Sequence, residues 1–427
     1  MKFIIAILIF SAVILFHELG HFLLAKKNGV GVIEFSLGMG PRLISTVRGG
    51  TRYSVKLFPL GGSCMMQGED SSDNEEGSFN SASVWGRISI IAAGPVFNFI
   101  LALIFAVIIV AAVGYEPAVV LQVQEDSPAA QAGLQEGDLI TNFQGYSVDL
   151  GKDVYLYQTL YTINSGDTVS LTYEREGEEY EISYVPEDYV RYLMGVTFES
   201  GSLEVSSLSE GMPAMDSGIQ PGDTLTSING TYFESIEAYS EYIQENPLQE
   251  KPVTVTYSRD GLEYESVITP KEYRVPMLGF SCNTACVKAR GFDIIKYGLI
   301  EVKYFIRTTV QSLKQLITGR FGIKDLSGPV GVVDVIGDTY EQSKSQGMLM
   351  VWMNMLNMAV LLSANLGVMN LLPIPALDGG RLVFLVIEAI RKKPVNREAE
   401  GMIHFAGLML LMLLMVVVMY QDIMKIL

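Results

Sequence analysis

Residues 3–25 read FIIAILIFSAVILFHELGHFLLA, an apolar run interrupted by the polar residues His17, Glu18 and His21. A helix needs roughly 20 predominantly apolar residues to cross a hydrocarbon core of about 30 Å. Three further stretches of comparable length carry no Lys, Arg, Asp or Glu: 88–114, 346–377 and 402–421. A soluble protein could bury one such helix, but four of them predict a multi-spanning α-helical membrane protein.

The first run also resembles a secretory signal peptide, because Lys2 precedes it. It does not end in a small-residue cleavage site, however, and instead leads through the two histidines to Lys26 and Lys27. We therefore expect it to be retained as the first of four transmembrane helices.

The distribution of Lys and Arg predicts how the chain is oriented in the membrane. The segments between spans one and two and between spans three and four are basic, with seven Lys or Arg in 26–87 and five in 381–397. By the positive-inside rule both face the cytoplasm. Residues 115–345 then lie outside, and their 16 Lys and Arg against 35 Asp and Glu argue against a nucleic-acid partner.

The histidines of the first span have the spacing of a metal site. His17 and His21 are four residues apart, so they lie on one face of a helix and can share one cation. Glu18 projects near the open side of that cation, where a carboxylate can take a proton from water. His-Glu-x-x-His occurs by chance in many sequences, but ionisable groups inside an apolar helix are costly and usually functional.

A catalytic zinc takes three protein ligands, and a carboxylate is the candidate for the third. The remaining histidine, His404, stands alone in the last apolar run. Asp378 follows Pro373 and Pro375, which should end the third helix near Leu371 and turn the chain back on the inner side of the membrane. Asp378 could instead be the N-cap of a helix that begins near Gly379.

The outer segment contains a repeat. Ser127–Ile140 reads SPAAQAGLQEGDLI and returns at Met212–Leu225 as MPAMDSGIQPGDTL, and further on Val169–Tyr180 matches Val253–Tyr264. Alternating strands, a short helix and Gly-Asp turns are typical of PDZ domains. Such a pair could bind peptides by strand addition.

Taken together, His17–His21, Gly94–Asn98 and Asn370–Gly379 on successive spans, with the PDZ pair between the last two, resemble the site-2 protease family, in its RseP-like bacterial regulator type. The resemblance implies an intramembrane zinc metalloendopeptidase with one Zn²⁺ per chain, held by His17, His21 and Asp378, and with Glu18 as general base. It also implies that Asn365 and Asn370 hold the substrate backbone and that Asn98 lies close to the site. The family offers an alternative to peptide binding by the PDZ pair, a gate that excludes substrates with bulky outer domains, and this is the reading we favour. The substrate would be a single-span membrane protein already shortened by another protease, such as an anti-sigma factor or a signal-peptide remnant.

The expected order of domains along the chain follows from the spans, the repeat and the family. It is a first transmembrane helix (1–27), a cytoplasmic-side membrane-associated β region with turns at Gly49-Gly50 and Gly61-Gly62 (28–82), a second transmembrane helix (83–114), two extracytoplasmic PDZ-like domains (115–189 and 190–275), an amphipathic helical region (276–345), a third transmembrane helix with the Leu-Asp-Gly motif (346–380), and a cytoplasmic-side loop with the fourth helix (381–427). The protein should be a multi-pass protein of the cell membrane, in contact with the lipid bilayer and with its site toward the cytoplasm.

Two rival functions remain at this level: a non-enzymatic scaffold that uses the PDZ pair, and an anchored zinc protease acting on soluble peptides outside. The second would need its His-Glu-x-x-His motif in a soluble domain, whereas here the motif lies in a span. Cys282 and Cys286 could form a disulfide or could be two free thiols, and sequence does not decide between them.

Overall fold

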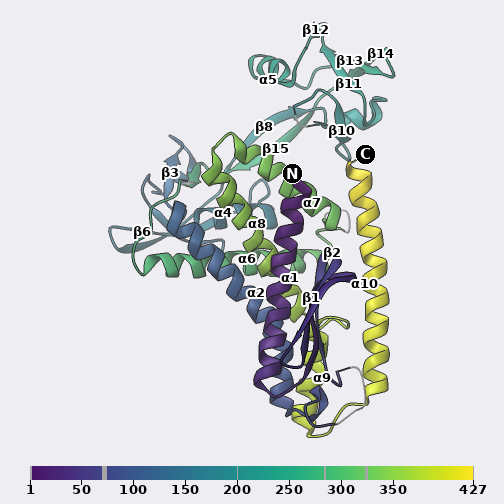
Figure 1. Cartoon of the computed structure of the whole chain (residues 1–427). Coiled ribbons are helices and arrows are strands. Elements are labelled where there is room, and N and C mark those ends of the chain that lie inside the picture. The colour runs from purple at the N-terminus through teal and green to yellow at the C-terminus, as the bar shows by residue number, and fades with distance from the viewer. Residues whose placement is uncertain (1, 70–74, 200, 283–284, 323–325, 427) are drawn as a thin grey trace. The chain divides into compact units, whose positions relative to one another are not determined.

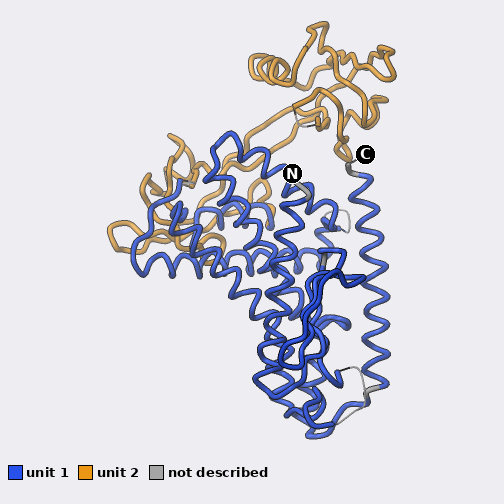
Figure 2. Tube along the Cα trace, viewed as in Figure 1, with its two compact units in different colours: residues 1–117, 149–160, 284–427 blue, residues 118–148, 161–283 orange. Residues whose placement is uncertain are grey.

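The computed structural model describes residues 2–69, 75–199, 201–282, 285–322 and 326–426. These residues form two compact units, coloured blue and orange in Figure 2. The first unit comprises 1–117, 149–160 and 284–427, and the second comprises 118–148 and 161–283.

Four helices of the first unit are long and apolar enough to cross a membrane. They are α1 (Lys2–Lys27), α2 (Val84–Val113), α8 (Met348–Leu371) and α10 (Arg397–Ile426), which correspond to the four spans expected from the sequence. The third span ends at Leu371, as the prolines beyond it predict.

Small residues let these helices approach closely around α2. A Cβ atom added to Gly20 of α1 would lie 2.3 Å from the carbonyl oxygen of Ala93 on α2. One added to Gly367 of α8 would lie 2.7 Å from the ring of Phe99. Close backbone approach is the usual basis of helix association in lipid, because apolar burial drives little there.

Between the first two spans the chain forms a long antiparallel hairpin, β1 (Val32–Arg48) and β2 (Thr51–Met66), with the expected turn at Gly49-Gly50. The chain also reverses at the expected Gly61-Gly62, although both glycines are counted within β2. Residues 34–37 of β1 pair in the same direction with 52–55 and in the opposite direction with 62–65, and Gly61 has φ +100°, so the chain turns back between these two stretches of β2.

Among its described residues the first unit, called the membrane unit below, also contains α4 (Gly151–Leu160), α6 (Asp293–Ile317), α7 (Pro329–Lys344), α9 (Asp378–Arg391) and a short 3-10 turn, η1 (Phe79–Ser81). The segment after the third span, expected to be a loop, is therefore largely helical. Helix α9 ends at Arg391, and the residue that follows it, Lys392, has a left-handed backbone with φ 54°.

The last helix, α10, is tied to α7 near its C-terminus (Figure 1). The buried carboxylate of Asp422 accepts hydrogen bonds from the backbone N–H groups of Gly328, at 3.1 Å, and Gly331, at 2.8 Å. Asp422 thus satisfies N–H groups at the start of α7 that the helix itself leaves without partners. Along its length α10 is the least buried of the four spans.

The second unit contains two copies of the same four-stranded sheet. In the first copy β4 (Leu139–Phe143) lies between β5 (Tyr146–Ser147) and β6 (Val169–Arg175), and β7 (Glu178–Tyr184) follows at the edge. The second copy has the same order, with β11 (Thr224–Ile228), β12 (Thr231–Tyr232), β13 (Val253–Arg259) and β14 (Leu262–Ile268). The repeat seen in the sequence therefore aligns strands of the first sheet with the equivalent strands of the second.

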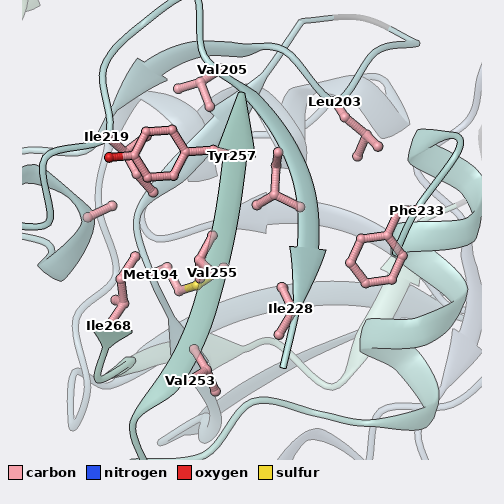
Figure 3. Packing of buried hydrophobic residues seen from close by; sticks show 12 residues of the cluster. Met194, Leu203, Val205, Ile219, Ile228, Phe233, Val253, Val255, Tyr257 and Ile268 are labelled. Atoms are coloured by element: carbon pink, nitrogen blue, oxygen red, sulfur yellow. The ribbon is translucent and has the colours of Figure 1, made fainter. Parts of the chain in front are cut away.

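Shorter elements complete the two copies. They are β3 (Val120–Val123), α3 (Pro128–Gln131), β8 (Glu187–Leu193), β9 (Val196–Phe198), β10 (Val205–Leu208), η2 (Pro213–Asp216), α5 (Ile236–Glu245), β15 (Lys271–Met277) and β16 (Phe280–Cys282). Figure 3 shows the core of the second copy, where Val253, Val255 and Tyr257 of β13 form one buried cluster with Ile228 and Phe233.

The helical region expected from residue 276 starts only at Asp293 of α6. Before it, β15 pairs with β8 and β16 pairs with β3, so the chain returns to the first copy as a strand after finishing the second. Cys282 on β16 is buried and Cys286 is exposed, and the structure joins neither of them in a disulfide among the described residues.

Candidate metal centre

Two buried histidines of α1 face one another at the centre of the membrane unit. His17 and His21 are one helical turn apart and are 8% and 7% exposed. Their Nε2 atoms lie 3.1 Å apart. An apolar helix rarely buries two imidazoles side by side unless they bind something.

Asp378, the first residue of α9, brings a carboxylate to the same point. Its Oδ2 lies 3.1 Å from Nε2 of His17 and 3.4 Å from Nε2 of His21. The N-cap position belongs to Leu377, and no side chain caps α9, so Asp378 does not serve as the cap that its position before Gly379 allowed. The side chain points away from the helix end, toward the histidines.

The bend before α9 depends on glycine. A Cβ atom on Gly379 would lie 2.1 Å from the carbonyl oxygen of Leu372, and one on Gly380 would lie 2.5 Å from that of Ile374. The start of α9 therefore packs directly against the backbone that precedes it. A cavity of about 510 Å³ lies beside α9 and is lined by Arg381, Glu388 and His404, among others.

Helix α2 fixes the ring orientations. Nδ1 of His21 lies 2.9 Å from the carbonyl oxygen of Ile90 and donates its proton to it. Nδ2 of Asn98 lies 3.1 Å from Nδ1 of His17, while Oδ1 of Asn98 is buried with no hydrogen-bond partner among the described residues; with the amide turned over, that oxygen would accept a proton from Nδ1. In that amide orientation both rings hold their proton on Nδ1, which leaves both Nε2 atoms free as metal ligands.

The donor set fits zinc. Zinc at about 2.0–2.1 Å from three tetrahedral ligands would separate the ligand atoms by roughly 3.3 Å, and the three atoms here are separated by 3.1, 3.1 and 3.4 Å. Within the described residues, this is the group of His, Cys, Asp and Glu side chains close enough to hold a metal ion. Oδ2 of Asp378 is buried and has no hydrogen-bond partner among the described residues, which fits a role as a ligand atom.

Comparison with known proteins agrees with this geometry. The model of peptidase family M50 matches residues 5–414. The zinc metalloprotease RasP of Bacillus licheniformis is 32% identical, with 98% of this chain and 98% of that protein covered. The regulator of sigma-W protease RasP of Bacillus subtilis is 31% identical, with 98% and 97% covered. The chain belongs to peptidase family M50.

Membership of M50, the site-2 protease family, confirms the family expected from the motifs, and with it a zinc metalloendopeptidase. Among solved structures, the crystal structure of the HtrA3 PDZ domain is similar to 21% of the chain, at 17% identity and a TM-score of 0.18.

In this M50 peptidase the β hairpin comes close to Glu18. A Cβ atom on Gly62 would lie 3.2 Å from Cγ of Glu18, so β2 passes directly over that side chain. Burial, followed by the charges of Glu18 and Glu69, raises the pKa of the Cys64 thiol on β2 to about 12. Cys64 therefore stays protonated at neutral pH and is a poor metal ligand.

The three asparagines occupy different places. Asn98 contacts His17, as described above. Oδ1 of Asn365 accepts a hydrogen bond from the hydroxyl of Thr309 on α6, and Asn370 lies half-buried in the last turn of α8.

Two contacts around the M50 site were not anticipated from the sequence. Ser363 of α8 donates a hydrogen bond to the backbone oxygen of Asn98 at 2.8 Å, which ties α8 to the part of α2 that orients His17. A Cβ atom on Gly94 would lie 2.3 Å from Nε2 of His21. A hydroxyl or a glycine within an apolar helix is the available signal for such contacts, but it does not reveal the partner.

Proposed function

We propose that this chain cuts single-span membrane proteins within or near their transmembrane segment. The observation that carries the proposal is the position of the donor atoms. His17 and His21 belong to a membrane-spanning helix, and Asp378 reaches them from the bend after another. A peptide bond can reach such a centre only if the substrate itself enters the membrane region.

His17, His21 and Asp378 would hold one zinc ion. When bound, zinc supplies a Lewis acid that polarises the scissile carbonyl and lowers the pKa of a water molecule at the site. Asn98 and the carbonyl of Ile90 keep Nε2 of each histidine available for it.

Glu18 would act as general base. Its carboxylate takes a proton from the attacking water and later delivers a proton to the leaving amine nitrogen. Gly62 leaves room for the Glu18 side chain beneath β2, so a substrate strand lying along the hairpin would present its backbone to the same carboxylate.

The substrate must be extended at the cut, because a helical peptide bond is shielded by its own hydrogen bonds and side chains. The hairpin β1–β2 offers an edge to which an unwound segment can add as a strand. Asn365 and Asn370 are proposed to hold its backbone. The hydrogen bond between Thr309 and Asn365 would then have to yield when a substrate binds.

The basic segments 26–87 and 381–397 favour a site that faces the cytoplasm, with the PDZ-like pair outside the cell membrane. We propose that the pair limits access to substrates already shortened on their outer side. The Bacillus subtilis relative is named a regulator of sigma-W protease, and by analogy an anti-sigma factor is a suitable substrate class.

The test is the substitution Glu18→Gln in the full-length protein. It removes the base and keeps the three proposed ligands, so zinc content should stay near one per chain while cleavage of a single-span model substrate is lost. Chelation of zinc from the wild-type protein should abolish cleavage as well. Glu341→Gln, which neutralises a glutamate whose side chain is 57% exposed on α7, is the matched control and should cut normally.

Cleavage by Glu18→Gln at the wild-type rate would contradict the proposed role of Glu18. Cleavage that persists after zinc is removed would contradict the proposed metal chemistry.

A further inference from the structure

The third histidine of the chain lies beside the bend that carries Asp378. Nδ1 of His404, on α10, accepts a hydrogen bond of 2.9 Å from the backbone N–H of Ala376. One side of the ring packs at a tilted angle on Phe384 of α9, with 5.6 Å between ring centroids. His404 is not part of the donor cluster of His17, His21 and Asp378.

The residue that His404 binds has an unusual backbone. Ala376 has φ +76°, in the left-handed region that residues with a Cβ atom seldom adopt, and it lies two residues before Asp378. A strained residue of this kind persists only where its surroundings hold it in place. The bend itself supplies two short-range backbone hydrogen bonds, from Ile374 to Leu372 and from Leu377 to Ile374, and neither involves Ala376.

A second residue of α10 presses on the same bend. Gly407 is three residues after His404, so both lie on one face of the helix. A Cβ atom on Gly407 would lie 2.4 Å from Cβ of Pro375 and 2.7 Å from its carbonyl oxygen. The glycine lets α10 come close enough for His404 to reach Ala376.

We propose that His404 is a positioning residue for the metal centre: it holds Ala376 in its left-handed conformation and so keeps the Asp378 carboxylate aimed at the two histidines. This inference rests on the proposed role of Asp378 as a ligand. Without the hydrogen bond, Ala376 would relax toward negative φ, and the chain would leave the bend two residues before the ligand. The metal would then be held by two histidines and a carboxylate that is only partly in place.

The experiment measures zinc release from the full-length, zinc-loaded protein by competition with a chromogenic chelator. His404→Leu removes the acceptor nitrogen and replaces the ring with an apolar side chain of similar bulk. His404→Asn retains an acceptor oxygen near the position of Nδ1. We expect His404→Leu to weaken zinc binding on the order of 10-fold, the usual effect of losing a partner that orients a ligand, and His404→Asn to restore most of it.

Phe405→Leu, at the neighbouring position where the side chain is 64% exposed, is the control and should bind zinc normally. Equal zinc binding by wild type and His404→Leu would overturn the proposal. Equal loss in His404→Leu and His404→Asn would overturn it too, since it would mean that ring packing and not the hydrogen bond matters.

A second pair of variants tests the bend directly. Glycine adopts positive φ without strain, so His404→Leu should cost less zinc affinity in an Ala376→Gly background than in the wild type. If His404→Leu does not fold, Ala376→Val takes its place, because a β-branched side chain opposes positive φ and should cause the same loss. The proposal would be contradicted if His404→Leu lowered zinc affinity equally in the wild type and in the Ala376→Gly background. Unchanged zinc binding by Ala376→Val would contradict it as well.

The two proposals fail in different ways. A wild-type protein that binds zinc and cuts its substrate, with no effect of His404→Leu, defeats only the positioning role. A wild-type protein that needs no zinc, or a Glu18→Gln variant that cuts, defeats the proposed function whatever His404 does.

Discussion

Gly94 places the backbone of α2 directly against both histidines. A Cβ atom there would lie 2.3 Å from Nε2 of His21 and 2.7 Å from Cε1 of His17, which is the space a bound metal and its ligand rings would need. We predict that Gly94→Ala reduces zinc content from about one per chain to near zero, measured by elemental analysis of the purified protein, with cleavage lost in parallel.

Gly401→Ala is the matched control for Gly94→Ala. It makes the same change in another spanning helix, at a position where the added methyl meets nothing within 4 Å. Zinc content and activity should be unchanged. If Gly94→Ala retained its zinc, the close packing of α2 on the histidines would not be a requirement of the site.

At the scale of residues, the sequence indicates which side chains to group, and only the structure shows what orients them. His17 and His21 follow from the spacing of a helix, and the prolines before Asp378 predict that the chain turns back toward them. The contact of His404 with Ala376 joins residues 28 apart in sequence, and that of Asn98 with His17 joins residues 81 apart. No local spacing encodes such pairs.

Each copy of the repeated sheet is closed by a buried ion pair. Asp138 binds Arg175 in the first copy, and Asp223 binds Arg259 in the second, each through two hydrogen bonds. Both aspartates are 1% exposed and belong to the Gly-Asp turns seen in the sequence. The carboxylate also accepts the backbone N–H of Gln135 in one copy and of Gln220 in the other, so it fixes the turn to the strand.

These pairs predict how the stability of the second copy depends on pH. The hydrogen bond from Arg259 lowers the pKa of Asp223 despite its burial. A carboxylate with a lowered pKa in the folded state stabilises the fold above its unfolded pKa of about 3.9, and that stability is lost as pH falls through the folded pKa. We therefore expect unfolding measured by calorimetry on the full chain to be insensitive to this group above about pH 5 and to shift to lower temperature below about pH 4.

Asp223→Asn should lower the unfolding temperature at neutral pH and weaken its fall on acidification. Asp216→Asn, at an exposed side chain of the same segment, is the control and should leave both unchanged. An Asp223→Asn protein that melts at the wild-type temperature at neutral pH would show that the pair does not stabilise the copy.

At the scale of elements, periodic patterns predict well and short or bent elements do not. The match of Val169–Tyr180 with Val253–Tyr264 predicts the equivalent hairpins β6–β7 and β13–β14, because alternation is strong in both. The strand β16 is too short to show a pattern, and it pairs with β3, which lies on the far side of both repeats in the sequence. The glycines at 61 and 62 predict a turn, and the chain does reverse there, but no pattern reveals that Gly62 passes close over Glu18.

The chain of the first repeat also contributes a helix to the membrane unit. Arg307 of α6 binds Asp149 at 2.7 Å and Asp153 at 3.1 Å, and Lys152 of α4 binds Glu301 at 2.6 Å. Asp153 is 1% exposed, so removing its guanidinium partner leaves a buried carboxylate only partly satisfied. We predict that Arg307→Ala destabilises the docking of α4 by about 2 kcal/mol, seen as faster hydrogen exchange of the α4 amides.

Lys344→Ala is the control for Arg307→Ala, because it breaks an exposed ion pair with Glu341 on α7. Exposed pairs contribute little, so exchange should not change. Protection of α4 that survives Arg307→Ala would mean that apolar packing, and not the ion-pair network, holds the helix on α6.

For the whole molecule, the central claim is that peptide hydrolysis takes place at membrane depth. The most direct measurement is the cleavage site in a single-span substrate, mapped by mass spectrometry after digestion by the full-length protein in lipid bilayers. The account predicts products cut within or immediately beside the transmembrane segment, with none formed by Glu18→Gln. Products cut only in the substrate's soluble regions, away from the membrane, would contradict it.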